Sequence, residues 1–164
     1  MIKIAQKENV LAIIKKKNGE IQKIKGHNIV TDNGDEYYAR KIVNDTSNIT
    51  TPFYLRLGTG TDNPTKSETD VENYIDGSAK QVDNGFPKRN YTDDGNSDGG
   101  VNVITYKITY GIGELEANDI SEGALVDNGD NPTKTLNHFL FDSSFNLTSN
   151  DQLIVFVNHS FVGV

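Results

Sequence analysis

The side chains best suited to catalysis are few and widely spaced. The 164 residues contain three histidines, His27, His138 and His159, and no cysteine. No histidine lies in a metal-ligand spacing such as His-x-x-x-His or beside a Ser or Asp that belongs to a catalytic motif. His138 and His159 could approach each other on neighbouring strands, although ordinary hydrogen-bonded histidines are the simpler interpretation. Carboxylates are plentiful, but a glycosidase pair must face across a cleft. We therefore expect no catalytic residues and no enzyme.

One segment resembles part of a calcium-binding loop. Asp94, Asn96 and Asp98 alternate with small residues and precede Gly99, as oxygen ligands do in the first half of an EF-hand loop. The bidentate glutamate is missing, because position twelve would be Thr105, inside a predicted strand. A metal-free Asp/Asn/Gly turn is the alternative. Apart from this candidate Ca²⁺ site at Asp94, Asn96 and Asp98, no cofactor is expected.

Charge is distributed unevenly along the chain. Residues 1–25 contain seven lysines and two glutamates, a net charge of +5, whereas the whole chain carries −7, so the remainder carries −12. Complementary charge speeds and orients protein docking, so the basic end is a candidate partner-binding surface for an acidic protein. A solvated hairpin is the alternative. The candidate residues are Lys15, Lys16, Lys17, Lys23 and Lys25.

Nucleic acid and membrane are not expected as partners. The basic end has no arginine for bidentate phosphate contacts and no aromatic ring for base stacking, and the acidic remainder would repel a polyanion. The longest apolar runs, such as residues 153–157, are far shorter than the roughly 20 residues that span a bilayer. The N-terminus lacks the apolar core and cleavage site of a secretory signal, so we expect synthesis in the cytoplasm.

The elements that must position these residues are mostly strands. Two strand-like runs flank Asn18-Gly19, a favoured tight-turn pair, which predicts a hairpin over residues 9–25. Cap-type residues before an amphipathic run predict one helix near residues 32–44, with Tyr38 and Ile42 facing the sheet. Residues 62–100 form a long polar loop, a type of segment that is often functional.

Further strands are predicted from alternating or short apolar runs. They cover residues 52–57, 103–110, 119–127, 136–142 and 152–157. In the second of these, Tyr106 lies on the inward face. Short strands at near-regular spacing indicate an antiparallel β-sandwich or barrel. We therefore predict a mainly β protein, with one short helix, as a single domain over residues 1–164.

Several motifs along the whole chain resemble small structural proteins of tailed double-stranded DNA bacteriophages. The resemblance lies in turn and strand motifs at residues 28–34, 55–61, 64–69, 104–107, 113–118, 120–127 and 151–155. Such proteins commonly contain an acidic-Ala-Gly-Leu-Phe segment. Here Gly123-Ala124 reverse that order and Val126 replaces the aromatic residue. The long acidic loop over residues 76–100 is a further departure.

The resemblance implies a non-enzymatic virion protein that is assembled in the host cytoplasm. A capsid decoration (cement) protein, bound to the major capsid protein as a homo-oligomer such as a trimer, is the leading interpretation. The alternative is a tail, baseplate or fibre protein that attaches to the host surface, with Tyr74, Phe86 and Tyr91 as contact residues. A calcium-dependent polysaccharide lyase or glycosidase is a third possibility.

Overall fold

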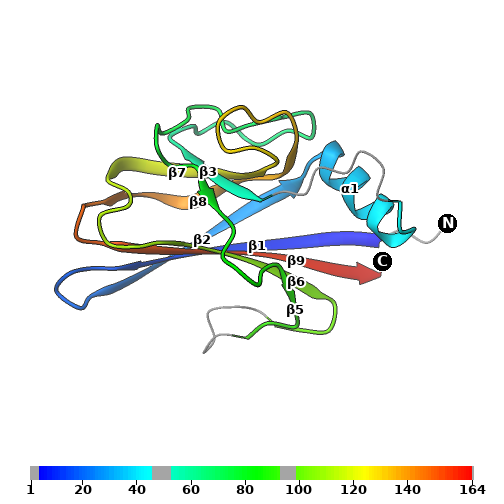
Figure 1. Ribbon diagram of the computed structural model, residues 1–164, viewed down its shortest axis with the longest axis horizontal. Coiled ribbons are helices and arrows are strands. Elements are labelled where there is room, and N and C mark those ends of the chain that lie inside the picture. The colour runs from blue at the N-terminus through cyan, green and yellow to red at the C-terminus, as the bar shows by residue number, and fades with distance from the viewer. Residues whose placement is uncertain (1–3, 46–52, 93–98, 164) are drawn as a thin grey trace.

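The computed structural model of the protein describes residues 4–45, 53–92 and 99–163. The strands are β1 (Ile4–Lys15), β2 (Ile21–Val30), β3 (Tyr54–Gly58), β4 (Lys80–Gln81), β5 (Lys88–Arg89), β6 (Val103–Tyr110), β7 (Ala117–Val126), β8 (Thr135–Leu147) and β9 (Gln152–Gly163), and the helix α1 spans Asp32–Ile42. All neighbouring strands are antiparallel, in the order β4-β3-β7-β8-β2-β1-β9-β6-β5. Figure 1 shows this single sheet curled into a half-barrel. The predicted mainly β class with one short helix is confirmed.

The first two strands form the hairpin that the Asn-Gly pair predicts. In its turn, the Lys16 N–H donates to the Glu20 carbonyl (2.8 Å) and the Gly19 N–H donates to the Lys16 carbonyl (2.9 Å). Gly19 has a φ of +87°, which favours glycine. β1 also pairs along its whole length with β9, so the first and last strands lie side by side.

The helix begins at a capped residue and rests on β8. The Thr31 side chain accepts a hydrogen bond from the Gly34 N–H (3.1 Å), a standard N-cap. A Cβ at Gly34 would collide with the Leu136 carbonyl oxygen, so the helix approaches β8 closely there. Tyr38 is buried in the core as predicted, but Ile42 is 75 % exposed. The prediction for Ile42 was wrong because the helix ends at this residue, beyond its contact with the sheet.

The main hydrophobic core fills the concave, inner face of the sheet. Every strand from β1 to β9 except the two short edge strands contributes apolar side chains to it, including Val10, Ile14, Ile24, Leu55, Leu57, Tyr106, Ile108, Ile120, Phe139 and Val155. Tyr106, Ile108 and Tyr110 are buried, as the alternation in residues 103–110 predicts. The burial of large apolar and aromatic surface on this face is the main source of the fold's stability.

Residues within the predicted polar loop 62–100 close the open side of the half-barrel. They contain the two short strands β4 and β5, which lie at opposite edges of the sheet. The Val82 N–H donates to the Phe53 carbonyl (2.7 Å), and the next N–H, of Asp83, donates to the Lys107 carbonyl (2.9 Å). The Asp83 carboxylate also accepts from the Thr109 N–H (2.9 Å) and hydroxyl (2.6 Å). This segment therefore connects the β3 and β6 edges.

Two further segments cover parts of the convex, outer face. Residues 59–79, which we call the cover segment, lie over β3, β7 and β8, where Val71 packs with Ala124 and Val126. At the opposite side of the sheet, Tyr91 packs on Phe156 of β9 with ring centroids 6.3 Å apart. The outer face of β1 and β2 lies between these two coverings.

No helix among the described residues is long and apolar enough to cross a membrane.

Candidate functional site

The outer face of the hairpin carries a line of lysines. Residues directly opposite each other in an antiparallel pair share a face, and Lys23 is opposite Ile13 while Lys15 is opposite Ile21. Lys25 lies two residues from Lys23 and so faces the same way. All three lysines are exposed, and none forms an ion pair with another described residue. With exposed Lys17 in the turn, they form what we call the basic strip.

Lys16 differs from the other four predicted partner-binding lysines. Its ammonium group lies 2.9 Å from Asp151 Oδ2 and 3.3 Å from the Asn146 carbonyl oxygen. Asp151 also accepts from the N–H (2.8 Å) and hydroxyl (3.0 Å) of Thr148, in the turn between β8 and β9. Lys16 therefore fixes the hairpin turn to the neighbouring turn, and the structure brings Lys15, Lys17, Lys23 and Lys25 together without it.

A second polar cluster lies under the cover segment. His138 of β8 contacts one carboxylate through each ring nitrogen: Nε2 lies 2.7 Å from Glu122 Oε2 of β7, and Nδ1 binds Glu68 of the cover segment. Glu122 is fully buried and accepts three backbone hydrogen bonds from the cover segment, from Gly60 (2.7 Å), Asn73 (2.9 Å) and Glu72 (3.0 Å). We call the Glu122–His138–Glu68 arrangement the histidine bridge.

The hydrogen bonds of the histidine bridge determine its charge state. Burial alone would raise the pKa of Glu122, but the hydrogen bonds from His138 and the three backbone N–H groups outweigh burial and lower this pKa. Burial alone would lower the pKa of His138, but its hydrogen bonds to Glu122 and Glu68 outweigh burial and raise it. These contacts therefore favour a protonated imidazole between the two carboxylates.

The three groups of the histidine bridge bind one another and do not face a common point. Both His138 nitrogens are occupied, and the two carboxylates bind opposite sides of the ring, so the three groups do not converge on one point where a metal or substrate atom could sit. Across the described ranges of the chain, no three His, Cys, Asp or Glu side chains form a group that could hold a metal ion.

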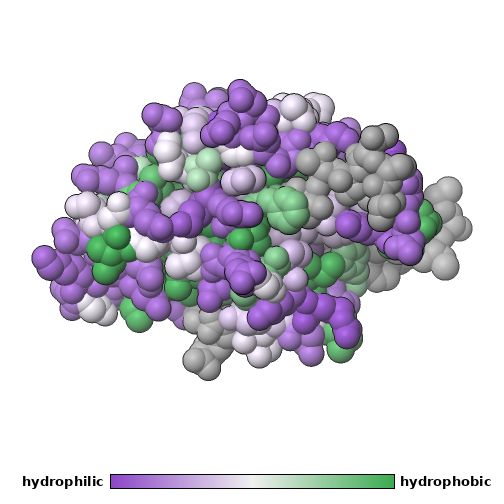
Figure 2. All heavy atoms as spheres, viewed as in Figure 1, coloured by the Kyte–Doolittle hydropathy of each residue, from purple (hydrophilic) through white to green (hydrophobic). Residues whose placement is uncertain are grey.

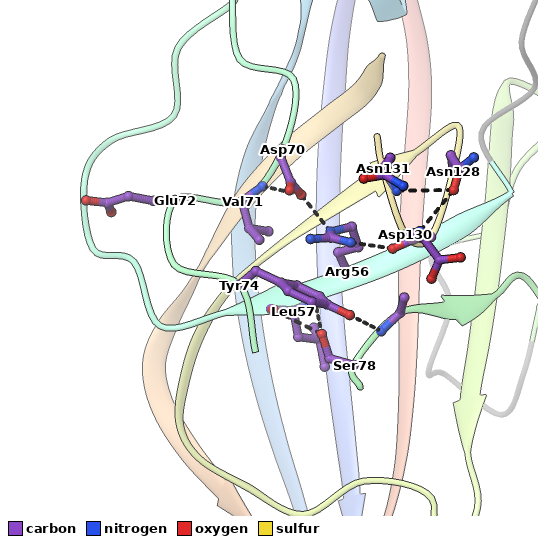
Figure 3. A network of polar contacts seen from close by, with 12 residues as sticks. Arg56, Leu57, Asp70, Val71, Glu72, Tyr74, Ser78, Asn128, Asp130 and Asn131 are labelled. Atoms are coloured by element: carbon purple, nitrogen blue, oxygen red, sulfur yellow. Dashed lines mark hydrogen bonds and ion pairs between the residues drawn. The ribbon is translucent and has the colours of Figure 1, made fainter. Parts of the chain in front are cut away.

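A third polar cluster surrounds Arg56, whose guanidinium is buried on the outer face of β3 (Figure 3). Its Nε lies 2.8 Å from Asp70 Oδ1, and Nη1 donates to the Gly129 carbonyl. The guanidinium carbon lies 3.4 Å from the ring centroid of Tyr74, a cation–π contact. Asp70 and Tyr74 belong to the cover segment, so this cluster is its second attachment to the sheet.

The other two histidines are separate from these clusters. His138 and His159 do not meet, because β2 and β1 lie between β8 and β9 in the sheet. His159 is buried between the rings of Tyr38 and Tyr106, at centroid distances of 5.4 and 5.5 Å. His27 is exposed and lies 3.2 Å from Asp142.

The remaining predicted site residues have varied positions. The candidate calcium ligands Asp94, Asn96 and Asp98 lie outside the described residues. The loop aromatics predicted as contacts for a fibre protein are partly buried: Tyr74 stacks on Arg56, and Phe86 packs edge-on against Tyr91 at 4.8 Å. Much of the surface of these rings is therefore buried inside the protein.

Figure 2 shows a mainly hydrophilic face with scattered hydrophobic residues.

Sequence reasoning singled out His138 and Tyr74 but missed the other residues of the two buried clusters. A weak signal existed for Arg56, because Leu55 and Leu57 alternate inward and Arg56 between them must lie on the opposite face. Glu122 stands directly before the apolar run 123–126, where a carboxylate implies a buried partner. No pattern pointed to Glu68, because its contact with His138 spans 70 residues of sequence.

Comparisons with known proteins give this chain no relatives. No family model, curated protein or solved structure matches it. The described part of the chain forms a curled antiparallel sheet with one helix and carries the basic strip on its outer face.

Proposed function

We propose that this chain is a non-enzymatic structural protein of a bacteriophage virion, most simply a capsid decoration protein. It binds the major capsid protein, and the basic strip is the docking surface. The motifs that resemble phage structural proteins suggest the setting. The observation that carries the proposal is the grouping of Lys15, Lys23 and Lys25 on one exposed face of a hairpin that is held by β8 and β9.

The charge distribution supports docking by the hairpin end. The first 25 residues carry +5 and the remainder −12, so an acidic lattice attracts the hairpin and repels most of the rest of the chain. Charge complementarity of this kind sets orientation and association rate more than affinity. The acidic remainder then points outward and keeps neighbouring particles apart.

The rigid backbone under the basic strip also favours binding. β1 pairs with β2 on one side and with β9 on the other, and the turn is tied by Lys16 to Asp151, so little backbone freedom remains to be lost on docking. Preorganisation reduces the entropic cost of association. Repeated weak contacts by symmetric copies, such as a trimer, then add up to firm attachment.

A non-enzymatic role agrees with how the described ionisable groups are used. Three of the buried ones, Glu122, His138 and Arg56, attach the cover segment to the sheet, so their polar atoms are used in structural contacts. The tail or fibre alternative is less well supported, because Tyr74, Phe86 and Tyr91 pack against other side chains.

Particle occupancy tests this function. Virions of the phage that encodes this chain are purified, and its copy number is measured by quantitative mass spectrometry and by electron microscopy with and without the gene. Many copies distributed over the head, with density lost on gene deletion, are expected. A few copies at the tail would favour the alternative, and absence from the particle would contradict the proposal.

Add-back to gene-deleted particles tests the basic strip. The triple variant Lys15→Glu, Lys23→Glu, Lys25→Glu is expected to lose most occupancy, while a triple reversal of equal charge outside the hairpin, at Lys41, Lys88 and Lys134, binds like the parent. Lys16 is left unchanged because it holds the turn. Parent occupancy should fall as salt rises, since exposed charges are screened beyond about 8 Å at physiological ionic strength. Equal binding by both triples would contradict docking through the strip.

A further inference from the structure

The histidine bridge joins three segments that are far apart in the sequence. Glu122 lies on β7, His138 on β8 and Glu68 in the cover segment. Glu122 is fully buried, whereas the Glu68 side chain is 28 % exposed. The two carboxylates therefore have different surroundings although they bind the same ring.

The two carboxylates also differ in how many groups hold them. Glu122 keeps three backbone N–H donors whatever the state of His138, from Gly60, Glu72 and Asn73. Among the described residues, the Glu68 carboxylate has only His138 as a hydrogen-bond or ion-pair partner. If one carboxylate must leave the ring, Glu68 is the one that leaves.

Loss of one proton from His138 forces that choice. A protonated imidazole donates from both nitrogens, but a neutral one donates from a single nitrogen and places a lone pair on the other. A lone pair that faces a carboxylate is repulsive, and an unpaired buried polar group is costly. The neutral ring can therefore keep Glu122 or Glu68, but not both.

We propose that the histidine bridge is a pH-dependent clamp, which holds residues 62–69 on β8 and α1 while His138 is protonated and releases them when it is neutral. Residues 58–60 and 72–73 stay attached through Glu122 in both states. This inference goes beyond the proposed function and does not depend on it.

Other charged groups near the bridge do not replace the His138 contact. Within the cover segment, Asp70 is paired with Arg56 of β3, and Glu72 accepts from the Thr61 (3.1 Å) and Asp62 (3.3 Å) N–H groups. Toward α1, Lys66 is paired with Asp35, and the Lys66 carbonyl accepts from the Asp32 N–H (2.9 Å). On β2, exposed His27 pairs with Asp142 of β8.

The direction of the pH effect follows from the two shifts. The pKa of His138 is raised above 6.5, so its contribution to stability is complete below that pH and is lost as pH rises through the raised value. The pKa of Glu122 is lowered below 4.5, so its contribution is complete above that pH and is lost as pH falls through the lowered value. The bridge is therefore intact between the lowered pKa of Glu122 and the raised pKa of His138. On the alkaline side it opens because His138 loses its proton.

Hydrogen exchange of single amides, resolved by NMR, tests the clamp. The Asp32 N–H reports the release, because it donates to Lys66 in the segment that would detach. The Gly60 and Asn73 N–H groups report the part that stays. After correction for intrinsic exchange, the protection of Asp32 should fall severalfold as the pH rises from about 6 to about 9, with Gly60 and Asn73 unchanged.

Two variants make the test specific. Glu68→Gln keeps the shape of the side chain, and its amide can accept from a protonated ring or donate to a neutral one. In this variant the Asp32 protection should become independent of pH, and the His138 titration, followed by ring NMR signals, should move to lower pH. His27→Gln is the matched control, because it removes the exposed His27–Asp142 pair and should leave the parent's behaviour intact.

Three outcomes would overturn the clamp: Asp32 protection that does not change with pH while His138 titrates, the same pH dependence in Glu68→Gln as in the parent, or a loss of pH dependence in His27→Gln.

Discussion

Lys16 Nζ lies 2.9 Å from Asp151 Oδ2 and joins two turns that are 135 residues apart in the sequence. The Asp151 side chain is 4 % exposed, whereas that of Lys16 is 26 % exposed. In a run of three consecutive lysines, the middle one thus holds the hairpin in place while Lys15 and Lys17 remain available to a partner. The geometry of the basic strip depends on this contact.

Replacing Asp151 with alanine should destabilise the protein by about 1–3 kcal/mol, because the Lys16 ammonium and the Thr148 donors lose their acceptor. Lys16→Met, at the more exposed end of the pair, should cost about 1 kcal/mol or less. Burial alone would raise the pKa of Asp151, but its hydrogen bonds outweigh burial and lower it below 3.8. The difference between parent and Asp151→Ala in urea unfolding should therefore be complete above that pH and shrink in stronger acid. Equal losses for the two variants would show that Asp151 has no role beyond its pair.

Replacing Tyr106 with aspartate should cost about 4 kcal/mol or more. Tyr106 is 1 % exposed on the inner face of β6, so the variant loses a core ring and buries a carboxylate. Ile112→Asp is the control, because Ile112 is 71 % exposed just beyond the same strand and should unfold like the parent. Thermal unfolding followed by circular dichroism measures both. A parent-like Tm for Tyr106→Asp would mean that the inner face of β6 is wrongly assigned.

Arg56→Lys should destabilise the protein by about 1–3 kcal/mol although it keeps the charge. A lysine cannot stack flat on Tyr74 while contacting both Asp70 and the Gly129 carbonyl. Arg89→Lys is the matched control, because Arg89 is exposed and donates only to the Val101 carbonyl among the described residues. The free energy of unfolding of Arg89→Lys should stay within about 0.5 kcal/mol of that of the parent. Chemical denaturation compares Arg56→Lys with Arg89→Lys, and equal stabilities of the two variants would argue against the need for a planar guanidinium group at position 56.

Gly60→Ala should loosen the cover segment. A Cβ at this position would lie 2.5 Å from Glu122 Oε1 and would also collide with the Glu72 carboxylate. The Glu122 side chain is fully buried and held by four donors, so it cannot easily move aside. The control is Gly111→Ala, where the nearest atom would lie at an ordinary 3.5 Å. Limited proteolysis at sites in residues 59–79 should be faster in Gly60→Ala alone. An unchanged rate of proteolysis would mean that the Glu122 side chain moves aside for the added Cβ.

Sequence patterns determined the local elements of this protein. The Asn18-Gly19 turn, the Thr31 cap and the alternation in residues 103–110 each depend on neighbours a few residues away, so the hairpin, the helix start and the phase of β6 could be predicted. The uneven charge was equally visible, because it requires only counting.

Contacts between distant segments were decided by the tertiary structure alone. The sequence shows seven lysines near one end, but only strand register places Lys15, Lys23 and Lys25 on one face and only folding brings Asp151 to Lys16. His138 gives no sign of its partners, since Glu68 and Glu122 reach it from a loop and from another strand. The physical reason is that short-range patterns fix backbone conformation, whereas burial and ion pairing depend on which strands become neighbours. The order of the strands is settled only when the whole curled sheet forms, through contacts between residues far apart in the sequence.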